Sequence, residues 1–255
     1  MTDATRDIDL LRITNTIHKW LVYADTVSQA DLLAESSIRY PLSEYLERRM
    51  QCICELEKAH PIFWDRRIDF IWKDKSDTQY YMELKFVRDD TTQKDETQRI
   101  FNDIYRQSCI LEEKEGRCLF VMCGEANLFK SQFCESIAIT RQRGRPRKTP
   151  IPQNAPINPN NVGQPQEHIY RSWFSFDNQN PEKTIKDEND NQPYFNTFCK
   201  TYKERSNGHL TNRRHNFKTR LILLMQDPEA DELKSQSIGL WEILLDNPNN
   251  QANND

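Results

Sequence analysis

Three charged side chains on two short apolar segments have the types and spacing to bind a divalent cation and assist phosphodiester hydrolysis. Asp69 lies in an aromatic and β-branched run at 66–72, and Glu83 and Lys85 lie in a second such run at 80–87. Carboxylate oxygens are the ligands that Mg²⁺ prefers in proteins. The ion polarises a phosphate and lowers the pKa of a bound water. A nearby lysine can orient or deprotonate that water, or stabilise charge on the phosphate.

The two segments that carry these charges are predicted to form a β-hairpin. Both are short and rich in aromatic and β-branched residues, and the polar residues 73–79 separate them. Because side chains alternate across a strand, Glu83 and Lys85 project from one face. Pairing of the strands can then bring Asp69 beside them. An exposed cross-strand ion pair with no catalytic role is the structural alternative.

The order of these residues resembles the signature of the PD-(D/E)XK nuclease superfamily, the fold of many restriction enzymes and DNA-repair nucleases. Asp69 is followed, after residues 70–82, by Glu83-Leu84-Lys85. The resemblance covers roughly 29–136 and one late strand, and Ile68 stands where the family name has Pro. It implies that Asp69, Glu83 and the Leu84 carbonyl are metal ligands and that Lys85 orients the water. It also implies Mg²⁺ as the cofactor, with Mn²⁺ as a substitute.

The family often adds a glutamate from the helix before the hairpin, and this chain offers two. Glu44, in Pro41-Leu42-Ser43-Glu44, is the first candidate for a further catalytic and metal-binding carboxylate. Glu35, in Ala34-Glu35-Ser36, is the second. Helical geometry leaves the choice open, because Glu44 points away from the apolar stripe assigned to the core.

The hydrophobic periodicity predicts an α/β fold, with a mixed central β-sheet flanked by helices and a restriction-endonuclease-like core with a long polar insertion. Helices are predicted at 9–23, 29–37, 41–58, 97–114 and 127–136. Strands are predicted at 66–72, 80–87, 117–123, 173–176, 218–226 and 237–245. The sequence therefore predicts a single nuclease domain over 1–255. It has its core at about 29–136 plus late strands at 217–246, a flexible basic and polar insertion at about 140–192, and a disordered tail at 247–255.

Basic residues gather in two segments that are candidates for DNA contact. Residues 141–148 read Arg-Gln-Arg-Gly-Arg-Pro-Arg-Lys, and the core Arg143-Gly-Arg145-Pro resembles an AT-hook, a short element that lies in the minor groove of AT-rich DNA. Arg147 and Lys148 extend this segment. Arg213 and Arg214 belong to the second, at 200–220. A solvated basic loop without sequence preference is the alternative for the first segment. The helix around Asp103 to Arg106 follows the second strand, where the resemblance implies phosphate contacts, but an ordinary exposed face is the favoured expectation for it.

Composition excludes several other classes of protein. The chain has 255 residues, 36% hydrophobic and 29% charged, and its six glycines form neither a phosphate loop nor a dinucleotide-binding turn. No apolar run approaches the length of a membrane span, and the N-terminus lacks the apolar region of a signal peptide. Seven cysteines without a C-x-x-C pair favour a reducing cytoplasm. The net charge of -4 is compatible with DNA binding only if the charges are unevenly distributed.

These features together favour a Mg²⁺-dependent endonuclease that acts on DNA, in restriction or anti-phage defence. The alternative is a catalytically inactive DNA-binding protein with a degenerate nuclease fold. A protein-interaction module, the third hypothesis, leaves the basic segment at 141–148 unexplained. A homodimer and an activating partner protein are both compatible with the sequence.

Overall fold

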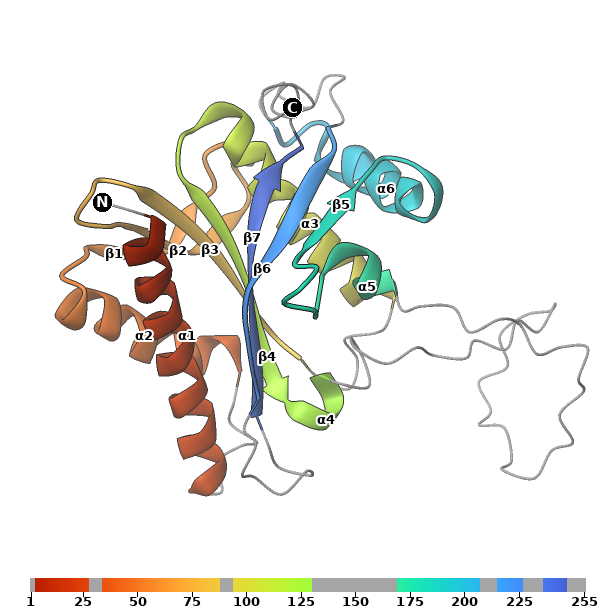
Figure 1. Ribbon diagram of the computed structural model, residues 1–255. Helices are drawn as coiled ribbons and strands as arrows, with labels where there is room; N and C mark the ends of the chain where they lie inside the picture. The colour runs from red at the N-terminus through yellow and green to blue at the C-terminus, as the bar shows by residue number, and fades with distance from the viewer. Residues whose placement is uncertain are drawn as a thin grey trace, which may run out of the picture.

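The chain folds around a mixed β-sheet with helices on both faces, which confirms the predicted α/β class (Figure 1). The computed structural model describes residues 3–27, 34–87, 94–129, 169–206, 215–226 and 236–246. Within these ranges the sheet has seven strands. Among the same residues, no helix combines the length and the apolar character needed to cross a membrane.

The strands run in the order β1-β2-β3-β4-β7-β6-β5 across the sheet. Their bounds are β1 (Cys54–Ala59), β2 (Arg67–Lys73), β3 (Gln79–Phe86), β4 (Arg117–Glu125), β5 (Glu182–Ile185), β6 (Phe217–Gln226) and β7 (Gln236–Leu245). β3 and β4 are parallel, and the other neighbouring pairs are antiparallel. The parallel pair needs a long crossover connection, which contains α3. β4 is central and covered on both faces, consistent with its continuous apolar run.

Helices cover the two faces of the sheet unequally. Their bounds are α1 (Asp3–Thr26), α2 (Glu35–Arg49), α3 (Lys94–Glu113), α4 (Ala126–Phe129), α5 (Ile169–Trp173) and α6 (Gln192–Tyr202). α1 and α2 lie on one side of the sheet, and α3, α5 and α6 lie on the other (Figure 1). The second side holds a dense aromatic cluster, in which Phe101 and Tyr105 of α3 pack against Phe195 of α6. The hairpin β2–β3 therefore lies between two packed layers.

The segment before the hairpin corrects two predictions. The helix predicted at 29–37 and the one predicted to start at Pro41 are, over the described residues, the single helix α2, which contains Pro41. The helix predicted to continue to residue 58 is wrong, because Cys54–Ala59 forms β1 and pairs with β2. The spacing of the apolar residues in Cys54–Ala59 fits the period of a helix as well as that of a strand. The backbone ladder to β2, the next strand along the chain, decides between them.

The region after residue 168 corrects two more predictions. A flexible insertion reaching residue 192 is wrong for 169–192, because Tyr170, Trp173 and Ile185 are fully buried in the aromatic core. The strand predicted at 173–176 is also wrong: Trp173 ends α5, and Phe174 and the residues after it have irregular backbone. The predicted strands at 117–123, 218–226 and 237–245 are confirmed as β4, β6 and β7. Residues 140–168 and the tail at 247–255 lie outside the described residues.

Candidate functional site

The hairpin brings Asp69 and Glu83 together inside the protein. The β2–β3 ladder pairs Phe70 with Met82, and continuing that register by one residue places Asp69 opposite Glu83. The two side chains interact electrostatically, and the residues are only 7% and 6% exposed. The Leu84 amide donates a hydrogen bond to Asp69 Oδ2 at 2.8 Å, which fixes the orientation of that carboxyl group. The juxtaposition predicted from strand alternation is therefore present.

Burial makes ionisation of both carboxyl groups costly. It raises the pKa of Asp69 to about 6, against the opposing effects of the Leu84 amide and of Arg39. Burial, the negative charge of Asp69 and that of Asp103 raise the pKa of Glu83 well above its usual range. Two carboxyl groups held together away from water are stabilised in their ionised forms by a nearby cation. This electrostatic pattern distinguishes the pair from a solvated cross-strand ion pair.

One oxygen of Glu83 has no partner. Glu83 Oε1 is buried and accepts no hydrogen bond. The nearest recorded cationic group is Arg106 Nη2, at 4.0 Å, which is too far for a hydrogen bond. Other buried polar atoms of the described residues also lack partners, Arg39 Nε and Arg106 Nε among them, so this oxygen is notable because it lies beside a second buried carboxyl group and calls for an explanation. An unrecorded water or a bound cation at this oxygen would supply one.

Lys85 projects beside the pair but is held by other carboxylates. Its Nζ forms an ion pair with Glu96 of α3, and it lies 3.4 Å from Glu35 Oε1 of α2. Burial alone would lower the pKa of Lys85, but Glu35, Asp103 and Glu96 together raise it. The lysine is therefore a protonated ammonium at neutral pH. In this state it acts as a hydrogen-bond donor and a positive charge, which favours the roles of orienting water or stabilising charge over deprotonating water.

The structure selects Glu35 over Glu44 as the helix carboxylate near the hairpin. Glu44 lies on the exposed side of α2, paired with Arg48 at 3.0 Å, so its predicted catalytic and metal-binding role is wrong. Glu35 Oε1 instead accepts a hydrogen bond from the Phe86 amide at 3.3 Å and contacts Lys85. The buried positions of α2 are Ile38, Leu42 and Leu46. Glu35 precedes Ile38 by three residues, on the same face, whereas Glu44 follows Leu42 by two residues, on the opposite face.

Sequence reasoning did not assign four residues of the cluster to the site: Arg39, Glu96, Asp103 and Arg106. Arg39 of α2 forms ion pairs with Asp69 and with Glu57 of β1. Asp103 and Arg106 of α3 pair with each other, and Arg106 is 6% exposed, so the ordinary exposed face predicted for this helix is wrong. Arg39 lies four residues after Glu35, and Asp103 lies three before Arg106. These spacings place each pair on one helical face, and this pattern is what could have predicted the pairs from the sequence.

The charges of the cluster do not balance. Five carboxyl groups face three cations, which leaves an excess of two negative charges if all of them ionise. The carboxyl groups belong to Glu35, Asp69, Glu83, Glu96 and Asp103, and the cations to Arg39, Lys85 and Arg106. Glu57 and Arg99, which pair with the outer members, cancel each other. A divalent cation would neutralise the excess.

The residues present fit Mg²⁺ or Mn²⁺ as a partly protein-bound ion. Within the described ranges, no group of three or more His, Cys, Asp or Glu side chains is arranged to hold a metal by itself. Mg²⁺ is commonly bound by one or two carboxylates, and waters and substrate phosphates complete its octahedron. Asp69 and Glu83 supply two carboxylates, and Glu83 Oε1 supplies an oxygen without a partner. The donor set is therefore suited to a cation shared with a phosphate.

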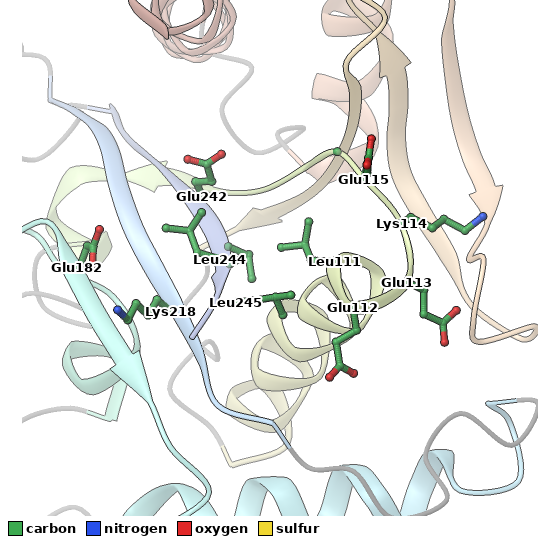
Figure 2. Close-up of a pocket in the computed structure, with 12 residues that line it drawn as sticks. Leu111, Glu112, Glu113, Lys114, Glu115, Glu182, Lys218, Glu242, Leu244 and Leu245 are labelled. Atoms are coloured by element: carbon green, nitrogen blue, oxygen red, sulfur yellow. The ribbon is translucent and has the colours of Figure 1, made fainter. Parts of the chain in front are cut away.

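The most prominent pocket of the structure lies away from this cluster. It has a volume of about 760 Å³, and none of its lining residues belongs to the carboxylate cluster. Figure 2 shows its leucine side chains between α3 and the paired strands, with Glu182 and Lys218 on the strand side and Glu112 and Glu113 along the helix. Because it lacks juxtaposed carboxylates without partners, the pocket is not the candidate site.

A second polar cluster has the residue types of a hydrolase triad. Ser108 Oγ lies 2.8 Å from His215 Nε2, and His215 Nδ1 lies 3.2 Å from Glu112 Oε2. Ser108 is fully buried and also donates to the Tyr105 carbonyl at 2.8 Å. The Ser108 hydroxyl has a single proton and donates it to the Tyr105 carbonyl, so His215 does not accept it as the base of a triad would, and the cluster ties the start of β6 to α3.

The predicted nucleic-acid contacts fall outside the described part of the chain. This applies to Arg143, Arg145, Arg147, Lys148, Arg213 and Arg214. Comparison with known proteins gave no relative: no protein-family model, curated protein or solved structure matches this chain. Function is therefore inferred from the side chains of the carboxylate cluster.

Proposed function

We propose that this protein is a Mg²⁺-dependent endonuclease that hydrolyses phosphodiester bonds in DNA through a PD-(D/E)XK-type site. The observation that carries the proposal is the buried pair Asp69–Glu83, with one oxygen of Glu83 lacking a partner and Lys85 two residues away on the same strand. The order of elements gives further support. A helix before the β2–β3 hairpin (α2), and a helix and a strand after it (α3 and β4), follow the order of elements that the resemblance implies.

Each residue has a role that follows from its contacts. Asp69 and Glu83 hold the cation, and Arg39 and the Leu84 amide keep the Asp69 carboxyl group in its orientation. When bound, the cation polarises the scissile phosphate and lowers the pKa of an attacking water. The Leu84 carbonyl is proposed as a further ligand, by resemblance alone.

Lys85 and Arg106 supply the positive charge that the developing phosphorane requires. The Lys85 ammonium is held between α2 and α3 by Glu35 and Glu96 and has three N–H donors. Preorganised donors of this kind stabilise charge in the transition state without reorganising. Arg106 is anchored by Asp103 and by a 3.0 Å hydrogen bond to the Tyr202 hydroxyl, and it lies near Glu83. Arg106 would contact a substrate phosphate bound at the carboxylate pair.

Cleavage of supercoiled plasmid tests the proposal. Wild-type protein is expected to nick it with Mg²⁺ or Mn²⁺ and not with EDTA. Lys85→Ala, Asp69→Asn and Glu83→Gln should each lose at least about 100-fold in rate, the loss typical of removing one transition-state contact. Glu44→Gln is the matched control and should cleave as wild type does. Cleavage that persists in Lys85→Ala and Asp69→Asn would end the site assignment.

DNA as the substrate rests on the basic segments of the sequence. Replacing Arg143, Arg145 and Arg147 by Gln should weaken DNA binding and flatten its dependence on salt, because fewer counterions are released per complex. An unchanged salt slope would remove this segment from the binding surface. The proposal places this activity in restriction or anti-phage defence in the cytoplasm, and it includes a homodimer and an activating partner protein.

A second candidate function is a DNA-binding protein without catalysis. The observation that favours it is internal pairing: Arg39 contacts Asp69, Arg106 contacts Asp103, and Lys85 contacts Glu96. In such a protein these ion pairs only stabilise the fold. DNA binding that is unaffected by Mg²⁺, with no nicking by purified wild-type protein, would support this candidate over the nuclease.

A further inference from the structure

The turn between β1 and β2 is braced from within. His60 Nδ1 accepts hydrogen bonds from the Ile62 and Phe63 amides at 3.1 and 3.2 Å. The His60 amide donates to the Arg66 carbonyl at 2.8 Å, and the Arg66 amide donates to the Phe63 carbonyl at 2.9 Å. Ile62 and Phe63 are buried, and the Phe63 ring packs edge-on against Tyr202 of α6. The backbone of this turn is therefore fixed in one conformation.

This braced turn presents an exposed tryptophan. Trp64 is 63% exposed, although its neighbour Phe63 is fully buried. Trp72, Trp173 and Trp241 are almost fully buried in the core. A large ring on a rigid turn loses little conformational entropy on binding, which makes it an efficient contact residue. Folding of the core does not account for its exposure.

Arg66 and Arg205 are cations at this turn, and the Tyr202 ring connects Arg66 to the carboxylate cluster. Arg66 lies over the Tyr202 ring at 5.2 Å, and Arg106 lies over the same ring at 5.7 Å. Arg205, just after α6, pairs with Asp65 of the turn at 2.9 Å. An arginine has five N–H donors, so a single carboxylate contact leaves several available. Arg66, two residues after Trp64, thus lies one aromatic ring away from Arg106.

We propose that Trp64, with Arg66 and Arg205, binds an unpaired stretch of nucleic acid next to the carboxylate cluster, with a base stacked on the indole ring and phosphates on the two guanidinium groups. Exposed aromatic rings interleaved with arginines are the combination that binds single strands, because every base has a face that stacks and every linkage carries a charge. A base paired within a duplex has both faces covered by its neighbours. This inference rests on the proposed function and names the form of its substrate: DNA with single-stranded character at the cut.

Binding without cleavage tests the surface separately from the catalytic site. A fluorescently labelled oligothymidine of about 16 nucleotides is titrated with protein in EDTA, followed by anisotropy, beside a duplex of equal length. Trp64→Ala should weaken binding of the single strand roughly 5- to 150-fold and change duplex binding less than about twofold. Trp64→Phe, which keeps a ring, should lose less. Tyr23→Ala is the matched control, because Tyr23 is an exposed aromatic residue on α1.

Intrinsic fluorescence provides a second readout. The oligothymidine should quench the emission of wild-type protein, and most of that quenching should disappear in Trp64→Phe, since Trp72, Trp173 and Trp241 are buried. Equal affinity of wild-type and Trp64→Ala protein for the single strand would overturn the inference, even if plasmid nicking is intact. Loss of binding in Trp64→Ala without any nicking by the wild type would support this surface and overturn the nuclease. Equal losses on single strand and duplex would overturn the preference for unpaired bases.

Discussion

Glu83 of β3 and Glu242 of β7 are both strand glutamates in the same sheet, buried to almost the same degree, at 6% and 4% exposure. Glu242 has a cation on each oxygen: Arg117 Nε lies 2.5 Å from Oε1, and Arg220 lies 2.5 Å from Oε2. Glu83 has a carboxyl group as its neighbour and one oxygen without a partner. Equal burial thus accompanies opposite electrostatic environments.

The difference separates a structural carboxylate from a candidate ligand site. Glu242 and its two arginines join β4, β6 and β7, and every strong acceptor in that group is used. Glu83 is not held between two arginines in this way, and its pKa is raised. Keeping such a carboxyl group buried costs stability, and proteins retain costs of this kind at functional sites. The 760 Å³ pocket includes Glu242 and not Glu83, so pocket volume alone would have pointed to the wrong carboxylate.

The largest expected effect is on stability and contrasts the two glutamates directly. Glu242→Gln removes the carboxylate that pairs with both Arg117 and Arg220 and should lower the free energy of unfolding by about 3–5 kcal/mol. Glu83→Gln removes a carboxyl group whose pKa is raised by burial and by Asp69, with Arg106 at 4.0 Å, and should be neutral or stabilising at pH 7. Urea unfolding of both variants measures this contrast. A large loss in Glu83→Gln would show that Glu83 is a structural residue like Glu242.

The next largest effect is a pH dependence of the free energy of unfolding, which the carboxylate pair causes. The folded-state pKa of Asp69, about 6, lies above its unfolded value of 3.8. Its contribution to stability is therefore complete below pH 3.8 and is lost as the pH rises through 6, by about 3 kcal/mol at most. Urea unfolding from pH 4 to 7 should show wild-type protein losing stability relative to Asp69→Asn over this window.

His60 also makes stability depend on pH, in the direction opposite to Asp69. Comparing wild-type protein with Asp69→Asn cancels this contribution. Burial lowers the pKa of His60 to about 3, so its contribution to stability is lost as the pH falls below 6.5. Both proteins contain His60, and its effect cancels in the difference. A difference that stays constant from pH 4 to 7 would contradict the raised pKa of Asp69.

The smallest effect sharpens the assignment of the helix carboxylate. Glu35→Gln removes a negative charge that holds Lys85 and should slow plasmid cleavage about 10- to 100-fold, because a misplaced catalytic group loses rate steeply. Glu44→Gln disturbs only an exposed pair with Arg48 and should leave the rate within about twofold. Rates measured with both variants at saturating Mg²⁺ test this. Equal rates would remove Glu35 from the site.

Local pattern predicted the part of the site that depends on adjacent residues. Alternation along two strands joined by a short polar loop placed Asp69 beside Glu83, and the structure agrees. It also placed Lys85 on the face of Glu83. It could not show that Glu96 and Glu35, which come from separate helices, hold the ammonium group.

The remaining errors arise where residues outside the local segment decide the structure. Cys54–Ala59 forms a strand because β2 pairs with it, although its apolar spacing also fits a helix. Residues 169–202 look polar locally, yet Trp173 and Phe195 are buried because α3 supplies Phe101 as a common partner. Arginine is a residue type that usually lies at the surface. Arg106 is buried instead, because Asp103 and Tyr202 bind its guanidinium group. Apart from Asp103 and the neighbouring strand β2, these partners are distant in the sequence.

Titration calorimetry with Mn²⁺ tests most directly whether the Asp69–Glu83 pair is a divalent cation site. Wild-type protein and the control Glu44→Gln should bind one ion at this pair with the same affinity. Glu83→Gln, which keeps the shape of the side chain and removes its charge, should lose this binding. An unchanged isotherm in Glu83→Gln would show that the buried pair holds no metal, and the proposed hydrolytic mechanism would fail with it.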